Sequence, residues 1–186
     1  MNFRVTLHYS STYGETQDGL VNVEGDTDDM LLEVNDKPMQ VPFEKQHTIM
    51  KFHPDGTPVF DFKNMDKRGT LPRATMATLF YRPSAPIALN EPFDREIKGN
   101  AEAQTVDAKA RTTVLGSESM DGVDCWKLQL VYAEQVEKLP MSTISTLWLS
   151  KADHDLIRAT SDVDNYQAVK MMPPSNSHIE IKRVPN

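Results

Sequence analysis

The sequence lacks most of the features that identify common classes of enzyme and nucleic-acid-binding protein. Its 186 residues include one cysteine, Cys125, so no disulfide can form within the chain. No stretch approaches about 18 consecutive apolar residues, so the sequence predicts no transmembrane helix. The formal net charge is −7, which argues against nucleic acid or an anionic membrane surface as a partner, because both select clustered Lys and Arg.

Motifs that carry catalysis are also missing. The sequence has no Gly-rich phosphate loop, no His-Glu-x-x-His zinc helix and no Gly-x-Ser-x-Gly nucleophile elbow. Cys125 falls in a predicted strand, where we expect a buried small hydrophobe rather than a nucleophile. We therefore predict a protein that is not an enzyme and has no catalytic residues, no metal site and no cofactor. An enzyme would need a polar pocket in which a His and a carboxylate meet.

Three groups of residues could contradict this prediction. His47 and His53 share a predicted strand, but a separation of about 20 Å is too large for a shared metal. The acidic segment 24–29 could bind Ca²⁺, but it lacks the full loop spacing, and a solvated hairpin turn is the simpler interpretation. Asp153 and Asp155 flank His154 in a predicted turn, where such residues are common for conformational reasons.

The most informative stretch runs from 111 to 163 and predicts four consecutive antiparallel strands. Asp121-Gly122 is a strong hairpin signal, because a two-residue type I′ turn needs positive φ at both positions. The returning arm places Trp126, Leu128 and Leu130 on one face and Cys125 and Lys127 on the other. Strands 142–150 and 156–163 follow, joined by a turn at 151–155.

The rest of the chain predicts more short strands and one clear helix. The other predicted strands are 3–9, 20–24, 30–34, 39–43, 47–53, 58–62 and 178–184. Turn-rich composition predicts that 10–19 and 25–29 interrupt them. The helix is predicted over 72–82, because Pro72 suits a first helical turn and Met76, Leu79 and Phe80 share a face. Residues 86–93 are expected to form a loop, and 94–106 carry no clear signal.

Two segments of the predicted four-stranded stretch 111–163 resemble the LolA/LolB-like lipoprotein-carrier superfamily and related bacterial envelope proteins of unknown function. They are 114–128, with its Gly, Glu, Asp-Gly, aromatic and Leu pattern, and 146–159, with Leu-Trp-Leu-Ser-Lys followed by Ile-Arg. The stretch 111–163, which contains both segments, makes up roughly a third of the chain. The resemblance implies one LolA-like domain over 1–186: mainly β, with a curved antiparallel sheet (a half-barrel) and one or two short helices on its concave face.

The resemblance also implies non-catalytic binding or carriage of a lipoprotein acyl chain or another hydrophobic ligand in the cell envelope. Ten Met residues supply adaptable apolar side chains for such a cleft, although ordinary core filling explains them too. We expect a periplasmic or otherwise exported protein whose signal has been trimmed, with a cytoplasmic location left open. The alternative is a structural or protein-interaction β-domain without a small-molecule ligand, partnered by an envelope protein. The predicted lining of the apolar cleft is Met76, Leu79, Phe80, Tyr81, Trp126, Leu128, Leu147 and Trp148.

Overall fold

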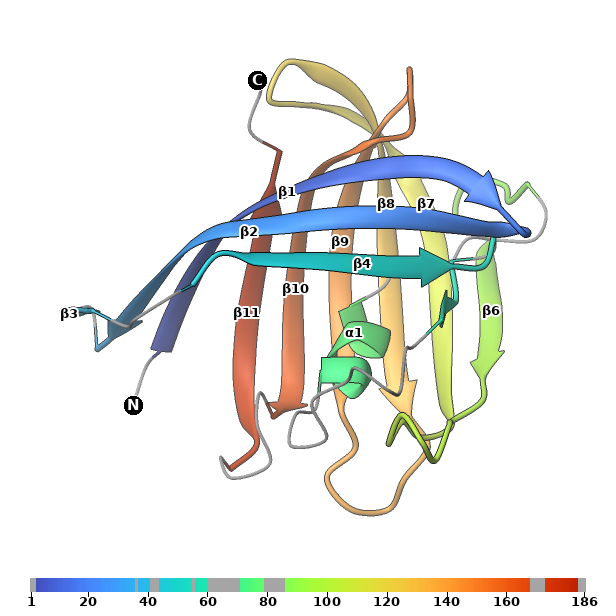
Figure 1. The fold of residues 1–186 in the computed structure, drawn as a ribbon. Helices are drawn as coiled ribbons and strands as arrows, with labels where there is room; N and C mark the ends of the chain where they lie inside the picture. The colour runs from blue at the N-terminus through green and yellow to red at the C-terminus, as the bar shows by residue number, and fades with distance from the viewer. Residues whose placement is uncertain are drawn as a thin grey trace. The chain divides into compact units, whose positions relative to one another are not determined.

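The computed structural model describes residues 3–35, 37–40, 44–54, 56–59, 71–78, 86–167 and 173–183. It confirms the predicted fold class: in this part of the chain the protein is mainly β, with antiparallel sheets and one short helix. The strands are divided between two sheets rather than gathered in one (Figure 1). Each sheet belongs to its own compact unit, Met1–Phe60 and Asp61–Asn186. The predicted single LolA-like domain stays a prediction.

The first unit is a five-stranded sheet built around two long strands. Its elements are β1 (Phe3–Gln17), β2 (Leu20–Val34), β3 (Lys37–Met39), β4 (Gln46–Phe52) and β5 (Pro58–Val59). The order is β1-β2-β4-β5, with β3 also paired to β2. Asp18 and Gly19 join β1 to β2 with φ of 52° and 76°, the left-handed pair that a type I′ turn requires.

Two predicted interruptions in this unit are wrong. β1 continues through 10–17, and β2 runs unbroken through 25–29, so two predicted strands are one. β2 pairs with β1 on one side and β4 on the other, and this two-sided pairing overrides the turn preference of Gly and Asp. A register shift opposite His8 and Tyr9 takes up the extra residue, Asp28.

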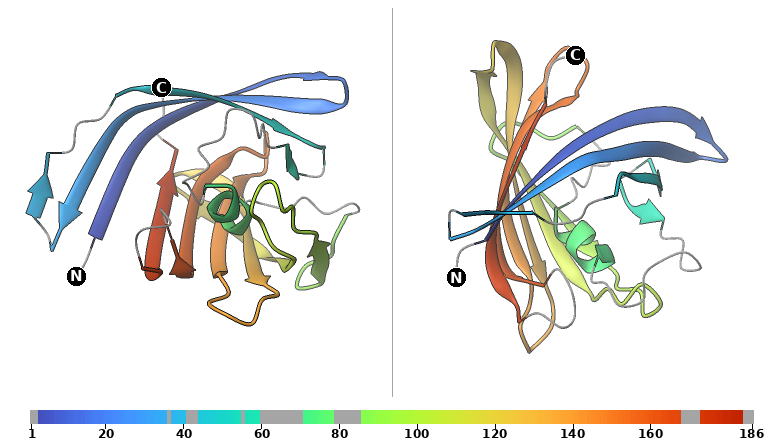
Figure 2. Two further views of the ribbon diagram at one scale, coloured as in Figure 1. Left: turned by 60° about the horizontal axis from the view of Figure 1, so that its bottom comes forward. Right: turned by 60° about the vertical axis from the view of Figure 1, so that its left-hand side comes forward.

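The second unit is a six-stranded antiparallel sheet with a helix on one face. Its elements are α1 (Leu71–Thr78), β6 (Pro92–Ile97), β7 (Ala108–Met120), β8 (Val123–Glu134), β9 (Ser142–Ser150), β10 (Leu156–Tyr166) and β11 (Ser175–Lys182). The strand order β11-β10-β9-β8-β7-β6 follows the chain, so every connection joins neighbouring strands. The sheet curves, and α1 lies on its inner side (Figure 2).

The sequence predicted the central strands of this unit well. Asp121 and Gly122 have φ of 51° and 82°, as the hairpin signal requires. The predicted helix is confirmed over Leu71–Thr78, and its predicted continuation to 82 lies outside the described residues. β6 was missed, because its polar alternation resembles a loop; it pairs with β7 along its whole length.

Candidate functional site

The pairing of residues between neighbouring strands shows on which face of the six-stranded sheet each side chain lies. Leu128 on β8 pairs directly with Leu147 on β9, which pairs with Ala159 on β10, so these three share the face that carries α1. We call this the inner face. Lys127, Trp148 and Arg158 form the neighbouring row on the opposite, outer face.

Helix α1 packs against β8, β9 and β10 across the inner face. Its Ala77 is completely buried and Met76 almost so. A small side chain at Ala77 allows the helix backbone to approach the sheet closely. Eight residues are too few for a stable isolated helix, so α1 depends on these tertiary contacts.

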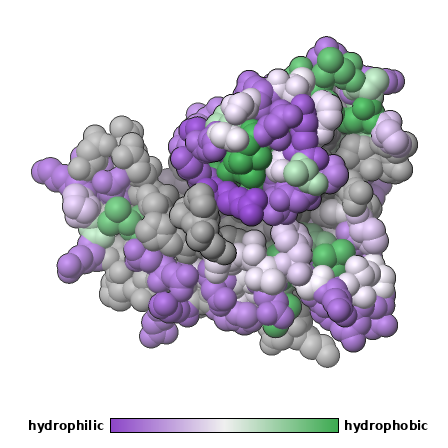
Figure 3. Space-filling model, turned by 90° about the horizontal axis from the view of Figure 1, so that it is seen from above, coloured by the Kyte–Doolittle hydropathy of each residue, from purple (hydrophilic) through white to green (hydrophobic). Residues whose placement is uncertain are grey.

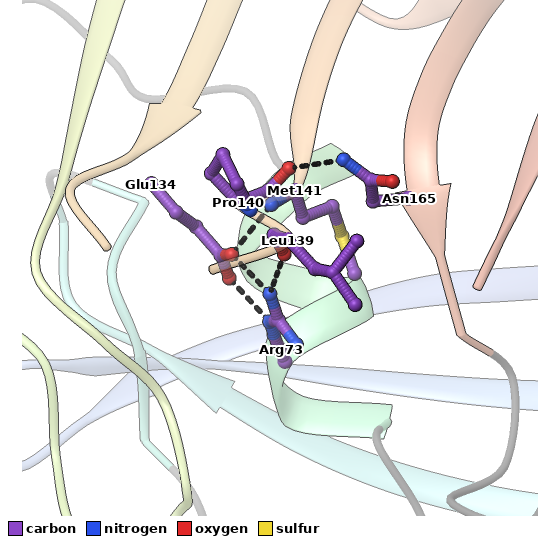
Figure 4. Close-up of polar contacts among 6 residues, drawn as sticks. All are labelled: Arg73, Glu134, Leu139, Pro140, Met141 and Asn165. Atoms are coloured by element: carbon purple, nitrogen blue, oxygen red, sulfur yellow. Dashed lines mark hydrogen bonds and ion pairs between the residues drawn. The ribbon is translucent and has the colours of Figure 1, made fainter. Parts of the chain in front are cut away.

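A buried ion pair fixes α1 to the end of β8 (Figure 4). The Glu134 side chain has no exposed surface, and it accepts hydrogen bonds from both Arg73 Nε (2.5 Å) and Arg73 Nη2. The same carboxylate accepts the backbone N–H of Met141 at 2.6 Å. Because both carboxylate oxygens accept hydrogen bonds, Glu134 links the helix to the start of β9.

The loop between β8 and β9 is held from two sides. Arg73 Nη2 also donates to the Leu139 carbonyl at 3.0 Å, and Asn165 Nδ2, at the end of β10, donates to the Pro140 carbonyl at 2.8 Å (Figure 4). Leu139 has φ of 47°, a left-handed conformation that costs energy in a non-glycine residue. These side-chain bonds support that backbone, so α1, the loop and β10 form one connected arrangement.

Burial and the ion pair shift the pKa values of neighbouring groups. The hydrogen bond with Glu134 raises the pKa of Arg73 above its ordinary value, against the opposing effect of burial. Burial, with a smaller contribution from the Glu134 charge, raises the pKa of the Tyr132 phenol far above its ordinary value. Tyr132 is therefore neutral near pH 7, and the arrangement holds one compensated charge pair in an apolar setting.

Toward the Asp121-Gly122 hairpin, the inner face becomes more exposed. Trp126, Leu149 and Leu156 form the next row beyond Leu128 and Leu147, because Trp126 pairs with Leu149 and Leu149 with Leu156. Leu149 and Leu156 are half-buried and Trp126 is 41% exposed. We call this row the apolar strip.

A cation borders the apolar strip. Lys151 Nζ lies 4.7 Å from the centre of the Trp126 ring and 3.1 Å from a carboxylate oxygen of Asp124. The Lys151 ammonium is attracted to the face of the indole, and its charge is balanced by Asp124. This polar edge fixes the position of the exposed indole.

The structure brings together part of the predicted cleft lining. Met76 lies on α1, and Trp126, Leu128 and Leu147 lie on the inner face. Leu79, Phe80 and Tyr81 lie outside the described residues. Trp148 is a correction: it pairs with Lys127 and so lies on the outer face, because it follows Leu147 directly on β9 and adjacent strand residues point to opposite sides.

On the outer face, Trp148 belongs to a small second core. It packs with Cys125 and Ile157, and Met120 and Val123 border this group. The Trp148 indole donates to Glu118, and Lys127 Nζ lies 5.4 Å from its ring. Cys125 is fully buried and burial raises the pKa of its thiol, as expected for a structural rather than a nucleophilic cysteine.

The other sequence candidates do not assemble into a site. The acidic segment 24–29 is part of β2 and not a loop, so both earlier interpretations of it are wrong; Asp26 pairs with His47 at 2.8 Å and Asp28 with Lys45 at 3.0 Å. Within the described ranges, no three His, Cys, Asp or Glu side chains gather closely enough to hold a metal. His154 has φ of 64° and donates its backbone N–H to Ser150, which confirms the turn.

Sequence reasoning missed Arg73 and Glu134. A signal for Glu134 was present, because the alternation that places Leu128 and Leu130 on the inner face continues through Tyr132 to Glu134. A carboxylate on an apolar strand face needs a buried partner. The partner lies 61 residues away in sequence and could not be identified without the fold.

The surface gives further context. Figure 3 shows one face of the molecule, on which hydrophobic residues form small separate groups among hydrophilic ones. In the described part of the chain, no helix has both the length and the apolar character needed to cross a membrane. The chain matches no protein-family model, no curated protein and no solved structure in the comparisons made.

Proposed function

We propose that the inner face and α1 form a binding surface for a hydrophobic ligand, and that the protein carries a lipoprotein acyl chain or a similar molecule in the bacterial envelope without covalent chemistry. The observation that carries this proposal is the apolar strip. Its partly exposed row continues directly into the buried pair Leu128 and Leu147, along strands that α1 packs against. The LolA/LolB-like resemblance of 114–128 and 146–159 supports the same function and a periplasmic location.

Burial of apolar surface supplies the binding free energy in this proposal. Each methylene transferred from water to the inner face contributes about 0.8 kcal/mol. A long acyl chain therefore binds without any charged contact. Such binding agrees with a protein whose formal net charge is −7. Ligand specificity then depends on the shape of the strip and on the position of α1 on the same face.

Native mass spectrometry of freshly purified protein tests the proposal. We expect a co-purifying apolar molecule that is lost on unfolding. Leu149→Asp places a charge within the apolar strip and should abolish loading, whereas Ile144→Asp, at a 54% exposed position on the outer face of the same strand, should leave it unchanged. Equal loading of the two variants would place the ligand elsewhere.

The competing function is a structural or protein-interaction β-domain with a filled inner face. The tethering of α1 through Arg73 and Glu134 favours it, because a helix fixed by a buried ion pair suits a permanent core better than a movable ligand cover. Under this alternative, the wild-type protein shows a clean apo mass and binds no hydrophobic fluorescent probe. That result would replace the carrier proposal, and a search for a protein partner would follow.

A further inference from the structure

The inner face carries buried hydroxyl groups among its apolar side chains. Ser145 on β9 pairs directly with Ser161 on β10, and their hydroxyl oxygens lie 2.7 Å apart. One hydroxyl donates to the other, so one of the two hydroxyl hydrogens remains outside this bond. Thr143 is the next inner-face residue on β9, and 1% of its surface is exposed.

The Thr143 hydroxyl has no hydrogen-bond partner within the described structure, although it is buried. Its ladder neighbours are Tyr132 and Val163, which are equally buried. An unpaired hydroxyl in such a place is costly, and valine would fill the same volume without that cost. The Thr143 hydroxyl can therefore donate a hydrogen bond, and the described residues supply no acceptor for it.

The adjacent charged groups do not meet this need, since the described residues give the Thr143 hydroxyl no partner. One pair further along the same face, both Glu134 oxygens accept from Arg73, and one also accepts the Met141 N–H. Arg73 Nη2 also donates to the Leu139 carbonyl. The Thr143 hydroxyl oxygen, unlike the Glu134 carboxylate, is buried without a hydrogen-bond partner within the described residues.

Along β9, the inner face changes from apolar to polar in a fixed order. Leu149 and Leu147 come first, Ser145 and Thr143 follow, and Met141 ends the row beside Glu134. Leu149 and Thr143 are separated by roughly 20 Å at the usual rise of a strand. This order matches an amphiphile that has a long apolar chain and a hydrogen-bond acceptor at one end.

We propose that the Thr143 hydroxyl donates a hydrogen bond to the carbonyl oxygen of an acyl ligand whose hydrocarbon chain extends along the inner face toward Trp126. This inference rests on the proposed function and names its ligand more closely: an acyl group that keeps its carbonyl, as a free acid or an ester. A neutral donor suits both forms, since it needs no charge on the ligand.

The test compares three ligands with the same chain length: a fatty acid, its methyl ester and the corresponding alkane. Each is delivered from cyclodextrin and competes with a hydrophobic fluorescent probe. Thr143→Val should weaken the acid and the ester about 3- to 10-fold, the value of one hydrogen bond, and leave the alkane unchanged. Thr143→Ser should retain wild-type affinity, and so should Thr146→Val on the outer face of the same strand.

The outcomes separate this inference from the proposed function. If Thr143→Val weakens binding of the fatty acid alone, the hydrogen bond is supported and the natural ligand carries a free carboxyl group. If it weakens binding of the fatty acid and of the methyl ester, esters are also ligands. If Thr143→Val binds all three ligands like the wild type, the inference fails while the carrier function stands. If the wild type binds none of the three, the carrier function itself fails.

Thermal unfolding without ligand provides a second readout. Thr143→Val should fold with a Tm equal to or above that of the wild type, because the substitution removes a buried unpaired hydroxyl at constant volume. A clear fall in Tm would show that the hydroxyl already has a partner within the protein, and this would overturn the inference.

Discussion

Replacing Glu134 with alanine is expected to lower the free energy of unfolding by about 3–5 kcal/mol, the cost of removing one partner from a buried ion pair. The substitution strands the Arg73 guanidinium, whose side chain is 22% exposed, and leaves the Met141 N–H without its acceptor. It also removes one of the contacts that hold α1 on the sheet. Chemical denaturation followed by circular dichroism measures the change.

Two further variants make this prediction specific to the ion pair. Glu137→Ala removes an exposed carboxylate from the same β8–β9 loop and should change stability by no more than about 0.5 kcal/mol. Glu134→Gln keeps the side-chain shape and one acceptor oxygen, so it should be less destabilising than Glu134→Ala. A loss below about 1 kcal/mol for Glu134→Ala would show that the pair does not hold α1 in place.

The second large effect is expected at Leu130, in the middle of the inner face. Leu130 has no exposed surface and lies between Thr112 on β7 and Ser145 on β9 in the ladder. Leu130→Ala should reduce the free energy of unfolding by about 2–5 kcal/mol, through lost apolar burial and the cavity that remains. Urea denaturation provides the measurement.

Leu89→Ala is the matched control for Leu130, because it deletes the same atoms from a side chain that is 58% exposed. Its effect should remain within about 0.5 kcal/mol. Similar losses at the two positions would contradict the placement of Leu130 in the centre of the core. A small loss at Leu130 alone would indicate that the inner face relaxes to fill the space.

The fold class was predictable because local signals and tertiary pairing agree in the second unit. Asp121-Gly122 supplies the turn, and the alternation along the returning arm, β8, fixes which of its residues face inward. Strand 142–150 was predicted with the bounds that the structure gives. Such agreement between turn chemistry and hydrophobic pattern is the condition under which sequence reasoning succeeds.

The errors fall where tertiary pairing overrides composition. Gly25 and Asp26 suggest a turn, but β2 has a strand on each side and its backbone hydrogen bonds are satisfied only if it continues. β6 alternates polar residues because its outer-face side chains form cross-strand ion pairs, such as Asp94 with Arg111 at 2.6 Å. Local sequence does not contain these partners.

The candidate site was predictable in outline and not in its polar details. The apolar residues Leu128 and Leu147 were assigned to one surface from alternation alone, and their direct pairing supports that assignment. Trp148 was grouped with them although it follows Leu147 on the same strand, and the strand period separates the two. Arg73, Glu134 and Thr143 depend on contacts between distant segments, so only the fold identifies them.

The most direct test of the central claim uses the two tryptophans, which lie on opposite faces of the sheet. In Trp148→Phe, the remaining emission reports on Trp126 in the apolar strip; in Trp126→Phe, it reports on Trp148 in the outer core. Titration with an acyl chain that carries a nitroxide quencher should strongly reduce Trp126 emission and change Trp148 emission little. Equal quenching of both, or quenching of Trp148 alone, would contradict ligand binding on the inner face.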